Sequence, residues 1–204
     1  MKRARRPSPP LSGQRVLVTR ARRQAGALAA LLRRQGATVM EIPSIEIRPP
    51  RSYRPLDQAL RHITEYDWLV LTSVNGVEAL FARLKKLRLT ARQLKGLRIA
   101  AIGPATRAAI EKRGLRVHVM PREYVAESVV QALRAKVKGK QVLLVRAKVA
   151  RDVIPNDLVK AGAKVDVIEA YETVLPESSR TELPAAALMI PVFYDRLVDN
   201  LSAN

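Results

Sequence analysis

The sequence predicts an α/β protein built on a doubly wound parallel sheet, and three observations lead to this prediction. Short apolar runs alternate along the chain with segments of helical periodicity. The runs are apolar throughout, as is typical of strands that helices cover on both faces. A unit of strand, helix and strand also occurs twice. A five-stranded sheet, with ligands bound beyond the carboxyl ends of its strands, is the architecture that these features favour.

Seven apolar runs predict strands: residues 15–20, 38–47, 67–73, 97–102, 117–120, 141–145 and 165–173. The first run is rich in β-branched residues. The second contains Pro43, which cannot donate a ladder hydrogen bond, so this strand is expected at a sheet edge or bent at the proline. The third run ends in a polar turn, which is where a following helix would begin.

Six segments between these runs predict helices: residues 22–35, 56–63, 75–87, 104–113, 126–137 and 155–161. The first of them has Leu28, Leu31 and Leu32 at helical spacing. Gly36 and Gly114 follow helices at the position of a C-cap. Near the end of the chain, residues 194–201 predict one further short helix.

The repeat aligns residues 16–47 with residues 142–173 at a constant offset of 126, without gaps and with ten identities over thirty-two positions. Generic similarity between any two strand–helix–strand units is the alternative explanation. The gapless length and the shared Arg-Ala after the first strand favour duplication. Arg20 and Arg146 therefore both lie at the carboxyl end of a strand, where a ligand would be expected.

Composition excludes several function classes. The chain has 204 residues, no cysteine and two histidines, so disulfides, thiolate catalysis and His-rich metal sites are not expected. No apolar run approaches the ~18 residues of a membrane span, and the basic N-terminus lacks the apolar stretch of a secretory signal. A cytoplasmic protein is expected. The net charge of +19 suggests an anionic partner, although a solubilising surface is an equal alternative.

Two helix N-termini are candidate carboxylate sites, because backbone N–H groups there bind anions. One follows the strand that ends near Thr72 and Ser73, and Asn75 lies in its first turn. The other begins at Gly103, with Thr106 as a hydroxyl donor. Simple helix capping is the alternative role for these polar residues.

Four ordered segments together resemble one family, the uroporphyrinogen-III synthases. They are VLVTR (residues 16–20) with Gly-Ala at 36–37, DWLVLTSVNGV (67–77), IGPAT (102–106), and Gly-Ala at 162–163 followed by IEAYET (168–173). Each is weak alone, and their order and spacing are more specific. The resemblance covers about residues 15–175.

The resemblance implies two flavodoxin-like domains joined by a pair of extended strands. Residues 1–14 would be a basic disordered tail. Residues 15–40 and 175–204 would form a discontinuous first domain, residues 48–168 the second, and residues 38–48 and 164–175 the interdomain strands. The family fold needs more strands and helices than residues 175–204 supply, so the first domain is expected to be incomplete. A truncated or frame-shifted gene, or compensation by dimerisation of a normally monomeric protein, are the alternatives.

The resemblance also implies a reaction. Family members cyclise hydroxymethylbilane, a linear tetrapyrrole with eight carboxylates, to uroporphyrinogen III, with loss of water and inversion of the last ring. They need no cofactor or metal. Tyr171 matches the tyrosine of the family's Tyr-x-Thr segment, which is thought to help the hydroxyl leave. Substrate carboxylates would be bound by the candidate residues named above, which are Arg20, Thr72, Ser73, Asn75, Gly103, Thr106 and Arg146.

Two other functions stay open. One is a non-catalytic module that binds a tetrapyrrole or another protein. The other is a nucleic-acid binder, which only the charge suggests. The scattered aromatic residues and the lack of a recognition motif disfavour that interpretation, so no nucleic acid and no membrane are expected as partners.

Overall fold

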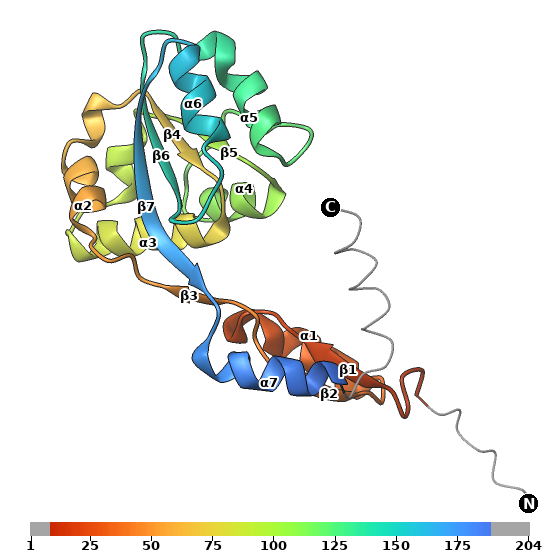
Figure 1. The fold of residues 1–204 in the computed structure, drawn as a ribbon. Coiled ribbons are helices and arrows are strands. Elements are labelled where there is room, and N and C mark those ends of the chain that lie inside the picture. Colours follow the sequence, from red (N-terminus) through yellow and green to blue (C-terminus); the bar gives the residue numbers. More distant parts are fainter. Residues whose placement is uncertain (1–8, 189–204) are drawn as a thin grey trace, which may run out of the picture. The chain divides into compact units, whose positions relative to one another are not determined.

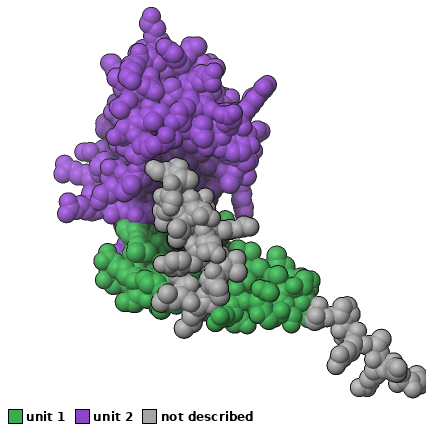
Figure 2. Space-filling view, turned by 45° about the vertical axis from the view of Figure 1, so that its right-hand side comes forward, with its two compact units in different colours: residues 1–47, 174–204 green, residues 48–173 purple. Residues whose placement is uncertain are grey.

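The computed structural model describes residues 9–188 of the chain, apart from the side chains of residues 22–24, 187 and 188. The chain divides into two compact units, residues 1–47 with 174–204 and residues 48–173 (Figure 2). Both contain parallel strands and helices, so the predicted α/β class with parallel sheets is confirmed. The chain passes between the units twice, within strands β3 and β7.

The first unit holds a two-stranded parallel sheet in its described part (Figure 1). Its elements are β1 (Arg15–Val18), α1 (Arg22–Arg34), β2 (Thr38–Glu41) and α7 (Glu177–Leu188). Helix α1 ends before Gly36, whose φ of 92° is the left-handed conformation that glycine adopts without strain. Its Leu28 and Leu31 remain 37% and 47% exposed.

The second unit is a three-layer structure around a five-stranded sheet in the order β3-β7-β6-β4-β5 (Figure 1). The strands are β3 (Glu46–Arg48), β4 (Trp68–Leu71), β5 (Arg98–Ala101), β6 (Gln141–Ala147) and β7 (Lys164–Val174). The helices are α2 (Arg54–Arg61), α3 (Val74–Lys86), α4 (Pro104–Glu111), α5 (Ala126–Leu133) and α6 (Val153–Lys160). Three short 3₁₀ helices complete it: η1 (Ile63–Glu65), η2 (Ala91–Leu94) and η3 (Arg134–Lys136).

Alternation along the strands builds the two core layers of this unit. Trp68 and Val70 of β4 and Val142 of β6 face one way, and they form a buried cluster with apolar residues of α5 and α6. Helix α3 contacts β4 and β6 and is itself contacted by α2 and α4. Helix α5 packs against α6, and Figure 1 shows this pair on the side of the sheet opposite α2 and α3. Burial on both faces explains why β4 and the middle of β6 are apolar.

The side chain of Asp67 links the amino ends of β4 and β6 by hydrogen bonds. Its carboxylate accepts hydrogen bonds from Lys140 Nζ at 2.8 Å and from the backbone N–H of Gln141 at 2.9 Å. The bond from Lys140 is the main cause that lowers the pKa of Asp67 below its ordinary value, and the Gln141 N–H adds to it. The amino ends of the two central strands are thereby fixed side by side.

Three sequence-based element assignments need correction. The expected strand 38–47 is two strands, because Pro43 and Ser44 interrupt it between β2 and β3. The expected strand 117–120 is wrong, because only an isolated bridge joins Val119 to Ala100. The reason lies in His118, whose Nδ1 accepts the N–H of Ile99 at 3.0 Å and so takes a donor that a ladder would use.

Helix α7 is the third correction, because no helix was expected between residues 161 and 194. Pro184 lies inside α7, where its missing N–H and its ring disfavour a helix, so the local sequence argues against the observed structure. Ser179 and Ala186 on this helix are buried. The short helix expected at residues 194–201 lies outside the described residues.

Candidate functional site

The strand order of the second unit has a topological switch point between β4 and β6. From β4 the chain proceeds outward to β5, and it then returns to the other side of β4 to form β6 and β7. Such a reversal separates the connections at the carboxyl ends of the two central strands, and open α/β sheets bind ligands there. Thr72 and Ser73 follow β4 at this point, and Arg146 lies near the end of β6.

Tyr171 of β7 lies within hydrogen-bonding reach of this place. The Tyr171 hydroxyl donates to Ser73 Oγ at 2.9 Å, and the ring is 8% exposed. The pairing of β6 with β7 shifts between Arg146 and Ala147, so Ala147 lies opposite Tyr171. A bulge of this kind rotates the residues that follow it and re-aims their side chains. The sequence-predicted residues Tyr171 and Ser73 are thus brought into direct contact.

Ser73 is held in place by the helix that it begins. It is the N-cap of α3, and its Oγ accepts the Gly76 N–H at 3.0 Å. A Cβ at Gly76 would lie 3.3 Å from Ser73 Oγ, which is a tight contact, so the absence of a side chain leaves room for the capping hydroxyl. Thr72 and Asn75 flank Ser73, and both are half-buried.

The positive electrostatic potential around Ser73 would stabilise a negative charge that forms beside it. The first N–H groups of α3 have no partner inside the helix, and the helix dipole is positive at this end. The first turn of α3 contains no acidic residue. Hydroxyl hydrogens rotate, so Ser73 can also donate to Tyr171 Oη when that oxygen becomes the better acceptor.

Arg146 takes a structural position in this molecule. It is 9% exposed, its Nη2 donates to Asp152 Oδ1 at 2.6 Å, and its Nη1 donates to the carbonyl oxygen of Arg151 at 3.1 Å. Only its Nε is buried without a partner. These bonds fasten the end of β6 to the loop before α6, and they use donors on both terminal nitrogens, for which a substrate carboxylate would have to compete.

The second predicted helix N-terminus is built differently. Gly103 is the N-cap of α4 and has no side chain to bond the helix, and a Cβ there would lie 3.4 Å from the ring of Tyr124. Thr106 is buried in the first turn of α4 at 4% exposure. Within residues 9–188, neither residue hydrogen-bonds to Ser73 or Tyr171. The structure therefore keeps these residues outside the hydroxyl pair.

Arg20 belongs to the first unit, where it follows β1 and is exposed. Two residues that support the site, Gly76 and Asp152, are not among the sequence-predicted ones. The spacing of Ser73 and Gly76, an N-cap and its third following residue, is a signal that could have identified the first. Nothing in the sequence marks Asp152 as the partner of Arg146.

The described residues contain no cluster of His, Asp or Glu side chains suited to a metal ion. Among them, no helix is both long and apolar enough to span a membrane.

Comparison with known proteins identifies the family. The family model for uroporphyrinogen-III synthase HemD matches residues 26–192. Uroporphyrinogen-III synthase of Synechococcus elongatus is 36% identical over 181 residues, 88% of this chain and 67% of that protein. A putative uroporphyrinogen-III synthase of Methanothermobacter thermautotrophicus is 32% identical over 163 residues, 79% of this chain and 63% of that protein. The chain thus spans about two thirds of the length of these relatives.

Solved structures show the same fold. Uroporphyrinogen III synthase of Thermus thermophilus covers 86% of this chain with a TM-score of 0.68 and 22% identity, in the selenomethionine form of a mutant, of which 69% is covered. The wild-type protein gives a TM-score of 0.59 at 23% identity, with 68% of it covered. The match of the family model to most of the chain, with a relative at 36% identity, makes this protein a member of the uroporphyrinogen-III synthase family.

Proposed function

We propose that this chain carries out the uroporphyrinogen-III synthase reaction as a lyase of porphyrin biosynthesis. The substrate would be hydroxymethylbilane, the product uroporphyrinogen III, and the site of action the cytoplasm. The observation that carries the proposal is the hydrogen bond between Tyr171 and Ser73 at the carboxyl ends of the sheet. It supports a role in proton transfer at a place where this fold class binds ligands.

The first chemical step would be departure of the terminal hydroxyl. The C–O bond breaks, the oxygen takes a proton and leaves as water, and the pyrrole that loses it becomes an azafulvene cation. Tyr171 is the proposed proton donor. A phenol O–H that is positioned beside the departing group can act as its general acid.

Ser73 would stabilise the phenolate that this transfer leaves. Its Oγ is fixed 2.9 Å from Tyr171 Oη, and its hydroxyl hydrogen can turn to donate to the phenolate. The N–H of Gly76 and the positive end of α3 act in the same direction. Such preorganised donors need no rearrangement when the charge appears.

Ring inversion and closure would then need positioning. The last ring is attacked at its substituted carbon to form a spiro intermediate, which rearranges, and the macrocycle closes with loss of a proton. Thr72 and Asn75, beside Ser73, and the N–H groups of α3 are proposed contacts for substrate carboxylates. Arg20, Gly103 and Thr106 remain proposals for the other carboxylates, and Arg146 would have to release Asp152 to contribute.

The test is turnover of hydroxymethylbilane by the purified full chain, with the uroporphyrinogen isomers resolved by chromatography. Isomer III is expected, whereas isomer I alone, which forms spontaneously, would refute the proposal. We expect Tyr171→Phe to lower kcat about 10²-fold or more, because general acid catalysis typically contributes that much. Ser73→Ala should have a smaller effect in the same direction. Tyr124→Phe, an exposed tyrosine outside the hydroxyl pair, is the matched control.

A second candidate function is binding of a tetrapyrrole without turnover. The observation that favours it is the first unit, whose described residues hold only the two strands β1 and β2. Saturable binding of uroporphyrin III, together with isomer I as the only product from hydroxymethylbilane, would support this function over catalysis.

A further inference from the structure

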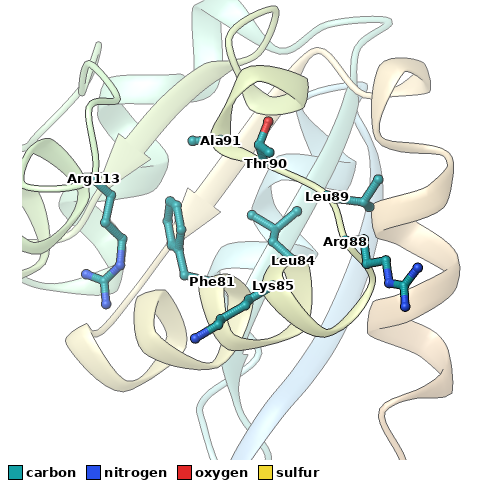
Figure 3. A pocket seen from close by; sticks show the side chains of 8 residues that line it. All are labelled: Phe81, Leu84, Lys85, Arg88, Leu89, Thr90, Ala91 and Arg113. Atoms are coloured by element: carbon teal, nitrogen blue, oxygen red, sulfur yellow. The ribbon is translucent and has the colours of Figure 1, made fainter.

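A pocket lies at the carboxyl end of α3, opposite the end that Ser73 caps. The pocket has a volume of about 440 Å³ and is lined by the last turns of α3, by the segment before and into η2, and by Arg113 after α4 (Figure 3). Helix α3 has 13 residues and is therefore ~20 Å long. Because Ser73 caps the beginning of this helix, the pocket is separate from the hydroxyl pair.

The lining combines an apolar floor with cationic groups. Phe81, Leu84 and Leu89 supply the apolar surface. Figure 3 shows the ring of Phe81 between the side chains of Arg113 and Leu84. The cations are Lys85, Arg88 and Arg113, and no acidic residue lines the pocket. Small-molecule sites in proteins typically have this size and this mixture of apolar surface and a few polar groups.

Arg113 is held at one wall of the pocket, whereas the other two cations have no partner among the described residues. The Arg113 guanidinium stacks over the Phe81 ring at 4.9 Å, and its Nη1 donates to the carbonyl oxygen of Ala109 at 2.9 Å. Within residues 9–188, the side chains of Lys85 and Arg88 make no hydrogen bond or ion pair. Their charges are therefore available to a ligand.

Arg88 occupies a backbone position that disfavours it. Helix α3 closes with the N–H of Arg88 bonded to the Lys85 carbonyl at 3.1 Å and the N–H of Leu89 bonded to the Leu84 carbonyl at 2.9 Å. This is the Schellman arrangement, which places Arg88 in the left-handed region with a φ of 60°. Arg88 is the only residue other than glycine with a positive φ in the described part of the chain.

Two other helices close in the same way with glycine at this position. After α1 and α6, Gly36 and Gly162 have φ values of 92° and 88° and the same pair of backbone bonds. Glycine adopts this conformation without strain, whereas a side chain makes it costly. Arg88 is thus a residue with a strained backbone at the rim of a cationic pocket. Strained backbone conformations are found preferentially at functional sites.

We propose that this pocket binds a small amphipathic anion, with its apolar body against Phe81 and Leu89 and its anionic group at the cationic rim. Figure 3 shows Lys85 on the Arg113 side of this rim and Arg88 on the opposite side, so each long side chain can turn toward the anion from its own side. The anionic group would be a carboxylate, sulfonate or phosphate. This inference is independent of the proposed catalytic function, because none of its residues belongs to the hydroxyl pair.

The experiment is a fluorescence titration of the full chain with 8-anilinonaphthalene-1-sulfonate, which joins an aromatic body to one negative charge. Saturable binding at a single site is expected. Arg88→Gly should weaken it about twofold to fivefold, the usual range for one partly exposed charged contact. The same variant should keep or raise the melting temperature, because it removes the backbone strain. Lys85→Gln should weaken binding similarly.

Two controls decide whether the effect is local. Arg134→Gln removes one exposed positive charge outside the pocket and should leave the affinity unchanged. N-phenyl-1-naphthylamine, which has the same body without the sulfonate, should bind at least tenfold more weakly. The proposal is overturned if Arg88→Gly and Lys85→Gln bind like the wild type, if Arg134→Gln weakens binding as much as they do, or if the uncharged compound binds equally well.

Discussion

The two copies of the repeat, β1–α1–β2 and β6–α6–β7, share their local structure and differ in their surroundings. Val16 pairs with Val39 in the first copy, and Val142 pairs with Val165 in the second, so the register is the same at an offset of 126. The turn after the helix also has the same backbone bonds in both copies. Local sequence therefore determines strand pairing and helix closure in either place.

Burial is what differs between the copies. Five consecutive residues of β6 are buried, whereas β1 buries only Val18. The cause is that β6 lies between β4 and β7 and α6 packs against α5, whereas in the described part of the chain β1 pairs with β2 alone. The same motif is thus a core element in one unit and a partly exposed one in the other. Substitutions at equivalent positions of the two copies should therefore differ in their effect on stability.

The largest difference is expected at the leucine shared by both helices. Leu158 is fully buried, and Leu158→Ala should cost about 2–5 kcal/mol by leaving a cavity. Leu32 is only partly buried, and Leu32→Ala should cost about 1 kcal/mol. Urea unfolding followed by Trp68, the single tryptophan, reports the second unit, and hydrogen exchange of β1 reports the first. Equal losses would show that α1 is covered as fully as α6.

The next pair is Arg146 and Arg20. Arg146→Ala should cost about 2 kcal/mol, because it removes a charged hydrogen bond and empties a buried position. Arg20→Ala should change stability by less than about 0.5 kcal/mol, because the side chain is exposed. If Arg20 binds a substrate carboxylate, its removal should instead raise KM at unchanged stability. A loss of stability in Arg20→Ala together with an unchanged KM would contradict both expectations.

The glycines that close the two helices should respond alike. Gly36→Ala and Gly162→Ala each force a side chain into the left-handed region and should cost about 1 kcal/mol. Gly36→Ala should cost slightly more, since its Cβ would lie 2.9 Å from the Cβ of Pro9. The same two probes, Trp68 fluorescence and exchange of β1, measure the costs. A neutral result at either glycine would mean that the helix end is not locally determined.

The smallest expected effect is a pH dependence confined to the second unit, which contains both histidines. Desolvation lowers the pKa of His118 below its ordinary value, and the neighbouring Arg116 and Arg98 add to this. The unfolded state therefore takes up the proton first as the pH falls. The stability due to the neutral ring is complete above pH ~6.5 and declines as the pH falls below it.

Urea midpoints at pH 7.5 and pH 5, followed by Trp68 fluorescence, measure this decline. In His118→Asn the decline should be smaller, because an amide oxygen can accept the Ile99 N–H without titrating. His62→Asn is the matched control, since His62 lies exposed beside Glu65. If the stability of His118→Asn falls between pH 7.5 and pH 5 as much as that of the wild type, the decline is due to other titrating groups.

The sequence predicted the parts of the fold that depend on neighbours along the chain. Strand runs such as 67–73 and helix ends such as Gly36 are local signals, and they predicted β4 and α1 to within a few residues. The predicted strand at 117–120 failed because the His118 side chain takes a backbone donor. Helix α7 was not predicted, because Pro184 inside it opposes a helix locally.

The same distinction holds for the site. Ser73 and Tyr171 were both named as candidates, but their direct contact depends on strand order and on the register shift beside Ala147, neither of which is local. Arg146 is a residue whose local sequence position suggested one role and whose tertiary contacts show another arrangement. Its place at a strand end suggested ligand binding, whereas its burial and its bond to Asp152 depend on the loop before α6.

The chain crosses from the first unit to the second and back again, and this affects the order in which the two units can fold. The second unit is one continuous segment, residues 48–173, inserted into a first unit made of two separate pieces. During synthesis this segment can fold as soon as it is complete, whereas the first unit must wait for residues from 174 onward. Folding of the insert places β3 beside β7 and brings its two ends together. The insert thereby removes most of the entropy cost of closing a long loop before the first unit assembles.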